Sequence, residues 1–168
     1  MNQFVLAQDS VIKSIGRDAF EDLVELTTLN FEAIEIGSIK EFAFRSSHPG
    51  VKPLTVTFTF EKILKTKLEP NSLLGSNRTI YLIIDSKASS NIPLELNKIH
   101  FKPFLDEKPG NTIRIKAPID CKHKIFDQNS WLLNDIRYKS QVDGKCGDGQ
   151  DFIEAINSFN NKQSTLMH

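Results

Sequence analysis

The sequence predicts an α/β solenoid, a stack of similar segments in which each segment adds one short parallel strand to a common sheet. Two observations predict it: a spacing of apolar residues that recurs along the chain, and short apolar alternations that follow at matching intervals. The chain has 168 residues, of which 39% are hydrophobic, which is enough for one continuous core. We therefore expect one domain or one stretch of a repeat array, and we exclude a mainly disordered chain.

The clearest repeat is a pair of segments that share the pattern I-x-x-I-x-x-x-A-F. They are "VIKSIGRDAF", which ends at Phe20, and "EIGSIKEFAF", which ends 24 residues later at Phe44. A pair of apolar anchors five residues apart then recurs along the chain, as Ile15 with Phe20, Ile39 with Phe44, Leu68 with Leu73, and Ile99 with Phe104. The alternative interpretation is an ordinary α+β domain in which these similarities are accidental.

Between the two segments lies "LTTLNFEAIEIGSI", from Leu26 to Ile39, which resembles the leucine-rich-repeat pattern L-x-x-L-x-L-x-x-N-x-I-x-x-I. In that family a short strand on the concave face is followed by a turn and a convex segment that returns to the next strand. The resemblance therefore implies parallel strands on a concave face. The family's asparagine is not reproduced in this chain. The corresponding positions are Ser10, Ile34, Ile63 and Lys87.

The register of the anchors predicts five strands, at residues 4–8, 28–32, 57–61, 81–85 and 112–116. Their inward residues are Val5 and Ala7, Leu29 and Phe31, Phe58 and Phe60, Leu82 and Ile84, and Ile113 and Ile115. Two insertions, "RSSHPGVKP" and "DSKASSNIPLELN", are rich in turn-forming residues and are expected to be surface loops. Residues 1–116 are therefore expected to form about four to five repeats, two of them with loop insertions.

The side chains between the inward residues should line the concave face, because strand neighbours point to opposite sides. Three columns are predicted, beginning at Phe4, Leu6 and Gln8; the third contains Glu32, Glu61 and Asp85. Adjacent carboxylates repel one another, so this acidic column favours a protein partner with a basic patch, although a solvated row without a ligand explains it equally. The predicted binding residues are Thr28, Asn30, Glu32, Thr57, Thr59, Glu61, Tyr81, Ile83, Asp85, Arg114 and Lys116.

The segment "IDCKHKIFDQNSWLLND", with the later "VDGKCGDGQDF", resembles the cysteine-containing C-terminal cap of extracellular leucine-rich-repeat proteins. The resemblance implies a disulfide between Cys121 and Cys146, with Trp131 covering the end of the core, while His123 stands where the family has another cysteine. Apolar residues at helical spacing predict a final helix, followed by a frayed polar tail: Phe152, Ile153, Ile156 and Phe159. Residues 117–168 are therefore expected to form the cap.

The cysteine segment suggests two kinds of chemistry. Cys121, His123 and Cys146 could begin a zinc site, but a structural zinc site needs a fourth ligand and the usual paired spacing is absent. A Cys/His catalytic pair lacks a recognisable orienting acid and oxyanion hole. The sequence therefore predicts no enzyme activity, with a small hydrolase as the least favoured alternative, and it predicts no metal and no cofactor. His48 and His100 are interpreted as surface residues.

The charge balance and the absence of long apolar runs limit the kinds of partner that we expect. Lysine plus arginine and aspartate plus glutamate both number 21, so no global field draws the chain to nucleic acid or to an anionic membrane. The apolar runs are far shorter than the roughly 20 residues that span a bilayer, so no membrane insertion is expected. The oligomeric state is left open.

The whole chain resembles secreted arthropod-type leucine-rich-repeat proteins, among them the non-catalytic subunits of secreted crustacean luciferases. The resemblance implies an extracellular protein-interaction or stabilising scaffold, and the chain as a fragment of a longer protein, because no signal peptide is visible at its start. If the chain is secreted, "NRT" makes Asn77 a glycosylation acceptor. The alternative is an intracellular, cytoplasmic repeat module with free thiols.

Overall fold

The computed structural model describes residues 3–5, 11–31, 35–48, 52–59, 65–85 and 94–166. The strands in these residues are β1 (Gln3–Val5), β2 (Val11–Ile15), β3 (Thr28–Phe31), β4 (Glu35–Ile39), β5 (Leu54–Thr59), β6 (Lys67–Leu68), β7 (Ile80–Asp85), β8 (Thr112–Ile119) and β9 (Val142–Cys146). The helices are α2 (Lys98–Glu107), the 3-10 helix η1 (Lys124–Leu133), α3 (Tyr138–Gln141) and α4 (Phe152–Leu166). The protein is thus an α/β fold, as the sequence predicts at this coarse level.

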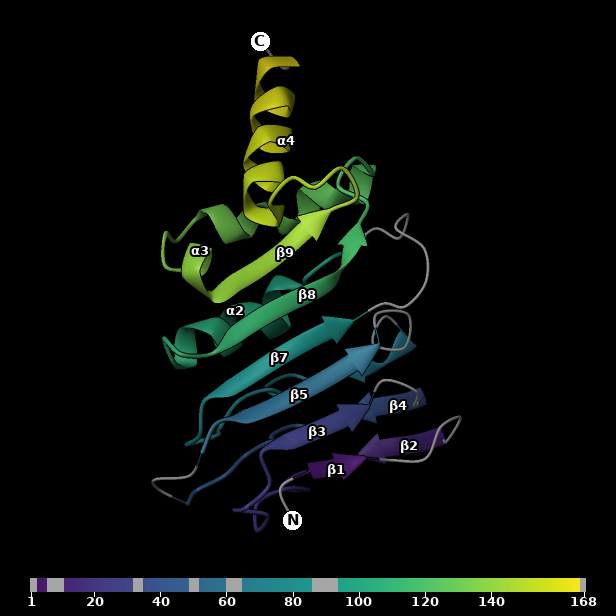
Figure 1. Ribbon diagram of the computed structural model, residues 1–168, viewed down its shortest axis with the longest axis vertical. Coiled ribbons are helices and arrows are strands. Elements are labelled where there is room, and N and C mark those ends of the chain that lie inside the picture. Colours follow the sequence, from purple (N-terminus) through teal and green to yellow (C-terminus); the bar gives the residue numbers. More distant parts are fainter. Residues whose placement is uncertain are drawn as a thin grey trace.

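The strands form two parallel sheets, and in each sheet they lie in the order in which the chain reaches them (Figure 1). The main sheet has the order β1-β3-β5-β7-β8-β9, and the second sheet has the order β2-β4-β6. The chain alternates between the two sheets up to β7, and after β7 it returns through α2 and after β8 through η1 and α3. Every crossover therefore leads to the next parallel neighbour in the main sheet.

Residues of the two matching sequence segments lie side by side in the second sheet. Ile12 pairs with Ile36 and Ile15 with Ile39. The rings of Phe20 and Phe44 are stacked with their centroids 5.5 Å apart. The spacing of 24 residues in the sequence therefore corresponds to positions that are neighbours in space.

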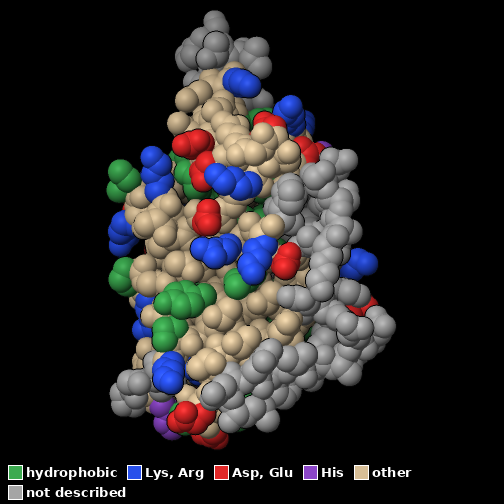
Figure 2. Space-filling view, viewed as in Figure 1, with side chains coloured by type: hydrophobic (Ala, Val, Ile, Leu, Met, Phe, Trp, Pro, Cys, Tyr) green, Lys and Arg blue, Asp and Glu red, His purple; other side chains and the backbone are tan. Residues whose placement is uncertain are grey.

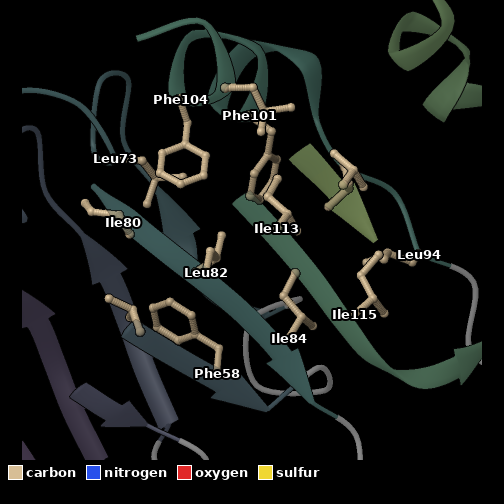
Figure 3. Close-up of a cluster of buried hydrophobic side chains, with 14 of the residues drawn as sticks. Phe58, Leu73, Ile80, Leu82, Ile84, Leu94, Phe101, Phe104, Ile113 and Ile115 are labelled. Carbon is tan, nitrogen blue, oxygen red and sulfur yellow. The ribbon is translucent and has the colours of Figure 1, made fainter. Parts of the chain in front are cut away.

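The core lies behind the main sheet and is built from rows of residues in register. One row comprises Leu29, Val56, Leu82, Ile113 and Val142, and each is at most 4% exposed. Figure 3 shows Phe101 and Phe104 of α2 packing over β7 and β8 from behind. Because each row repeats the same contact from strand to strand, the apolar alternation of the sequence becomes one continuous core.

One predicted anchor, Ile99, is wrong: its side chain is 68% exposed. The pair Ile99 and Phe104 falls in α2, and a helix of 3.6 residues per turn rotates by about 140° over five residues. The two side chains therefore face opposite sides, and Phe101, Phe104 and Leu105 form the buried stripe instead. A spacing of five residues places two anchors on the same side of a non-helical segment, but not of a helix.

The predicted register is wrong at two strands. Leu29 pairs with Val56 and not with Phe58, so β5 is shifted by two residues relative to the prediction. Phe4, and not Val5, pairs with Leu29, which is a shift of one residue for β1. The segment "TVTFTF" alternates throughout, so a slip of two residues keeps the apolar side inward, and the sequence pattern alone does not fix the choice.

The main sheet continues beyond residue 116, because β8 extends to Ile119 and β9 pairs with it as a sixth strand. Cys146 of β9 is joined to Cys121 by a disulfide, as the resemblance implied. The predicted final helix is confirmed as α4, in which Phe152 is fully buried and meets the ring of Phe126 edge-on. Trp131 is also buried, and its Nε1 donates a hydrogen bond to the carbonyl of Leu96 at 2.8 Å. These elements cover the β9 end of the core.

Candidate functional site

The front of the main sheet, which faces the viewer in Figures 1 and 2, presents the outward side chains of its strands. Burial alternates along the strands, so these side chains are mostly half-buried or exposed while their neighbours are in the core. We call this surface the open face; its described members are Thr28, Asn30, Thr55, Thr57, Thr59, Tyr81, Ile83, Asp85, Thr112, Arg114, Lys116, Asp143 and Lys145. Figure 2 shows charged side chains gathered over β8 and β9, with hydrophobic ones beside them over β7.

A hollow of about 410 Å³ lies on the open face between β5 and β9. Its lining includes Thr55, Tyr81, Ile83, Thr112, Arg114, Ser140 and Asp143, together with the buried residue Gln141. This volume falls within the range of roughly 300 to 1,000 Å³ that is typical of ligand-binding clefts. The hollow is therefore large enough to receive several protruding side chains of a partner.

Tyr81 is the aromatic residue of the hollow and is 40% exposed. In the sheet register it stands between Thr55 of β5 and Thr112 of β8. An aromatic ring flanked by two threonine side chains offers apolar area, hydroxyl donors and hydroxyl acceptors within one row of the sheet. Tyr81 is therefore suited to anchor a partner group that is partly apolar and partly polar.

Arg114 and Asp143 form an ion pair across β8 and β9, with 3.6 Å between Nε and Oδ2. Both side chains are mostly exposed, at 62% and 64%. An exposed pair of this kind contributes only about 0–1 kcal/mol to stability. Both charged groups therefore remain available to a partner at little energetic cost.

The predicted binding residues that the structure describes all lie on the outward side of the main sheet, but Thr57 is buried, at 8% exposed. Three of them line the hollow: Tyr81, Ile83 and Arg114. Glu32 and Glu61, which make up most of the predicted acidic column, lie outside the described residues. Asp85 pairs in register with Thr59, so the predicted alignment of Asp85 with Glu61 is wrong. The charged residues described around the hollow include both signs.

Sequence reasoning missed several residues of the hollow. Thr55 was missed because of the two-residue error in the register of β5, and Ser140, Gln141 and Asp143 because the strand β9 was not expected. The segment "VDGKC" did carry a usable signal for a strand, since every second residue is buried: Val142, Gly144 and Cys146. Position 144 favours glycine, because a Cβ there would stand only 3.1 Å from Cβ of Ile115.

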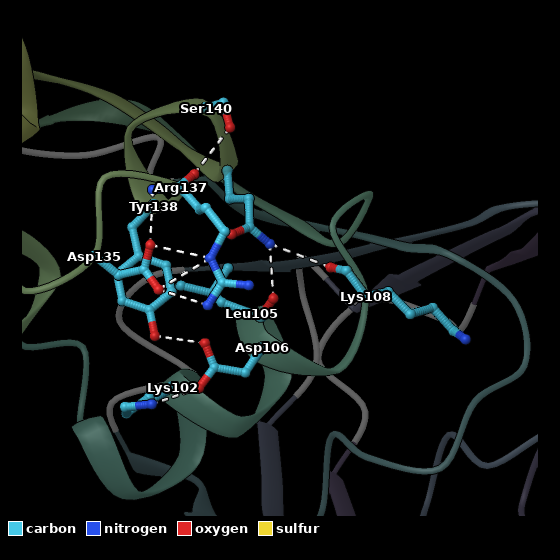
Figure 4. Close-up of polar contacts among 9 residues, drawn as sticks. Lys102, Leu105, Asp106, Lys108, Asp135, Arg137, Tyr138 and Ser140 are labelled. Carbon is cyan, nitrogen blue, oxygen red and sulfur yellow. Dashed lines mark hydrogen bonds and ion pairs between the residues drawn. The ribbon is translucent and has the colours of Figure 1, made fainter.

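A polar cluster behind the hollow fixes α3, the helix that carries Ser140 and Gln141 (Figure 4). The hydroxyl of Tyr138 and the ammonium of Lys102 each donate to Asp106 at 2.5 Å. Burial raises the pKa of Asp106, but these two hydrogen bonds, together with the positive charges of Lys102 and Arg137, outweigh burial and hold that pKa below its usual value. The cluster therefore ties α3 to α2 through an ionised carboxylate.

At the start of α3, Asp135 accepts hydrogen bonds from the side chain and the backbone N–H of Arg137. These bonds lower the pKa of Asp135 to about 2. The carbonyl of Arg137 in turn accepts a hydrogen bond from the hydroxyl of Ser140 at 2.8 Å. Local bonds thus close the turn that leads into the wall of the hollow.

Three buried polar side chains stand just before successive strands and satisfy backbone groups at that edge of the main sheet. Arg78 precedes β7 and donates to the carbonyls of Leu26 and Lys52, and burial lowers its pKa. Asn111 precedes β8, accepts from the N–H of Ile80 at 3.0 Å and donates to the carbonyl of Phe104 at 2.9 Å.

Gln141, the third of these side chains, precedes β9 and donates to three carbonyls: Leu105, Lys108 and Asn111. The family's asparagine positions, Ser10, Ile34, Ile63 and Lys87, lie outside the described residues. Sequence reasoning singled out none of the three edge side chains.

The cysteine segment holds no thiol for chemistry, since Cys121 and Cys146 are bonded to each other. Among the described residues, no group of three His, Cys, Asp or Glu side chains is arranged to hold a metal ion. His48 is 45% exposed and lies 3.8 Å from the carboxylate of Asp22. His100 is half-buried on α2, and burial lowers its pKa.

Comparisons with protein-family models, with curated proteins and with solved structures found no match to this chain. In the part of the chain that the structure describes, no helix has the length and apolar character needed to cross a membrane.

Proposed function

We propose that the chain is a stretch of a secreted leucine-rich-repeat solenoid, and that it acts without chemistry of its own as a protein-interaction module whose open face binds a partner protein. The observation that carries the proposal is the hollow of about 410 Å³, with the exposed ring of Tyr81 beside the Arg114–Asp143 pair. In this proposal the open face takes the role of the concave face that the sequence interpretation assigned to binding.

The leucine-rich-repeat assignment is supported by the order of the strands. Both parallel sheets add strands in chain order, and the two matching sequence segments lie in register in the second sheet. A repeat array produces this arrangement because each repeat contacts only its neighbours. The elements after β8, with the disulfide, correspond to the cap that such an array needs at its end.

Protein binding at the hollow is supported by the kinds of residue that it combines. Tyrosine and arginine are enriched among the residues that dominate binding energy in interfaces. A half-exposed aromatic ring loses little conformational entropy when it is buried, because it has only two side-chain torsions. The threonines on either side of Tyr81 provide hydroxyls for the polar groups of a partner's backbone.

An extracellular location is supported by the disulfide between Cys121 and Cys146, because disulfides persist in oxidising compartments and are rare in the cytosol. The alternative, an intracellular module with free thiols, predicts that both cysteines of material isolated from its natural source react with an alkylating reagent without prior reduction. Intact mass after alkylation, with and without reductant, separates the two locations.

The binding function is tested by capture from the extracellular fluid of the natural source, with proteins quantified by mass spectrometry. The double variant Tyr81→Ala/Arg114→Glu should lose at least one protein that the wild type retains, with a loss of roughly 10-fold or more, since each such residue contributes on the order of 1–2 kcal/mol. The matched control is Ile99→Ala, which removes an exposed apolar side chain from α2, outside the open face. Capture that is the same for all three proteins would refute the open face as the site.

A further inference from the structure

We propose that Asn77 carries an N-linked oligosaccharide, and that it is attached before the edge of the sheet around Asn77 folds. Asn77, Arg78 and Thr79 form an Asn-x-Thr acceptor in the loop that enters β7. The proposal rests on the secretory route of the proposed function and is independent of binding at the open face. An Asn-x-Thr motif is short and often occurs by chance, so the placement of its three side chains in the fold is decisive.

The side chain of Asn77 is exposed, and its Nδ2 donates a hydrogen bond to the carbonyl of Ser47 at 2.9 Å. An amide nitrogen carries two hydrogens, and attachment of a sugar replaces only one of them. The remaining N–H can keep the bond to Ser47 while the sugar extends into solvent. Attachment of a sugar therefore does not by itself remove the donor that contacts Ser47.

The other two residues of the acceptor, Arg78 and Thr79, make contacts within the folded protein. Arg78 is only 3% exposed and donates to the carbonyls of Leu26 and Lys52. The carbonyl of Thr79 accepts from the N–H of Leu54 at 2.9 Å. The side chain of Thr79 packs closely on Gly110, where an added Cβ would stand 3.1 Å from its methyl carbon.

A transferase must bind the acceptor as an accessible peptide that includes the threonine hydroxyl. In the folded chain Arg78 and Thr79 cannot leave their positions unless the edge at Leu26, Lys52 and Leu54 opens. Attachment must therefore come first, and the burial of Arg78 then follows on a chain that is already modified.

The transfer balances with a donor of one chemical class, an oligosaccharide linked through diphosphate to a polyprenol lipid. Nδ2 of Asn77 forms a bond to the anomeric carbon of the first sugar. The bond from that carbon to the diphosphate oxygen breaks, and the lipid diphosphate leaves with the bonding pair. Nδ2 loses one proton, so the side chain stays an uncharged amide.

The first experiment is secretion of the whole chain, behind an added signal peptide, from insect cells. The secreted protein should carry one oligosaccharide that is released by peptide-N-glycosidase, which leaves aspartate at position 77. Asn77→Gln and Thr79→Val should abolish the modification, whereas the matched variant Thr79→Ser keeps the acceptor hydroxyl and should retain it. A secreted wild-type chain with unmodified Asn77 would overturn the proposal.

The order of events is tested with two forms of the unmodified chain, offered to solubilised microsomes with the lipid-linked donor. The folded, oxidised chain should stay unmodified, while a synthetic peptide that spans residues 70–85 should be modified at Asn77. Efficient modification of the folded chain would contradict attachment before folding. Either result leaves the binding role of the open face unaffected, so the failures of the two proposals are distinguishable.

Discussion

The variant Asn111→Ala tests whether the buried polar side chains at the edge of the main sheet hold the strands in register. Asn111 is 2% exposed, accepts a hydrogen bond from the N–H of Ile80 and donates one to the carbonyl of Phe104. Alanine leaves both backbone groups without these partners in a site that water does not reach. An unsatisfied buried polar group costs about 1–3 kcal/mol, so the loss should be about 2–5 kcal/mol.

The measurement is equilibrium unfolding in urea, followed by the fluorescence of Trp131, the single tryptophan of the chain. For a protein of this size the expected destabilisation lowers the midpoint of thermal unfolding by roughly 5–15 °C. Asn111→Asp should also destabilise the protein, because its buried carboxylate would face the carbonyl of Phe104 that the amide of Asn111 now donates to.

Asn157→Ala is the matched control, since Asn157 is exposed on α4 and its replacement should change stability by less than about 0.5 kcal/mol. If Asn111→Ala is as stable as Asn157→Ala, the edge side chains do not hold the strands, and the reasoning is refuted.

Three further predictions concern the cap and the polar cluster behind the hollow. The disulfide between Cys121 and Cys146 spans 25 residues, so its reduction should cost about 3–4 kcal/mol by the chain-entropy estimate, measured as urea unfolding with and without reductant; an unchanged midpoint would contradict this. The lowered pKa of Asp106 means that its contribution to stability is present above its unfolded value near 3.8 and is lost as pH falls through the lower folded pKa. Asp106→Asn should therefore lose less stability than the wild type between pH 7 and pH 3, and equal losses would show that Asp106 has no part in the acid dependence. Tyr138→Phe removes a hydrogen bond to that carboxylate and should cost about 1–3 kcal/mol at pH 7, with a smaller cost in the Asp106→Asn background; equal costs in both would exclude the contact.

The sequence predicted the strands of the main sheet well where local patterns decide them. Alternating apolar residues mark Leu29 and Phe31, and Leu82 and Ile84, and these residues are buried in β3 and β7. The segments that end at Phe20 and Phe44 are neighbours in space, because a fixed sequence spacing brings equivalent residues together in stacked parallel strands.

The register of β5 was not predictable from the pattern, because "TVTFTF" satisfies the same inward rule at two positions. The alignment of Thr55 with Thr28 and Tyr81 depends on how the chain turns before β5, which residue types alone do not specify. Which residues line the hollow therefore became clear only from the strand pairing in the structure.

The wall of the hollow escaped prediction for a different reason. β9 is a five-residue strand with Gly144 at its centre, and glycine is unfavourable in strands unless another part of the chain approaches closely. Here Ile115 and Phe152 make that approach. This requirement for glycine is not visible in the local sequence, so the alternation in "VDGKC" was not interpreted as a strand and Asp143 was not assigned to the site.

The central claim is that the open face around Tyr81 meets a partner protein, and site-specific photo-crosslinking tests it most directly. The chain would carry p-benzoylphenylalanine in place of Tyr81 in one preparation and in place of Ile99 in another, each illuminated in the extracellular fluid of the natural source. We predict a discrete crosslinked protein at position 81 that is absent at position 99 and that is lost when Arg114→Glu is added. Crosslinks that are the same at both positions, or a position 81 that yields none while position 99 does, would contradict the account.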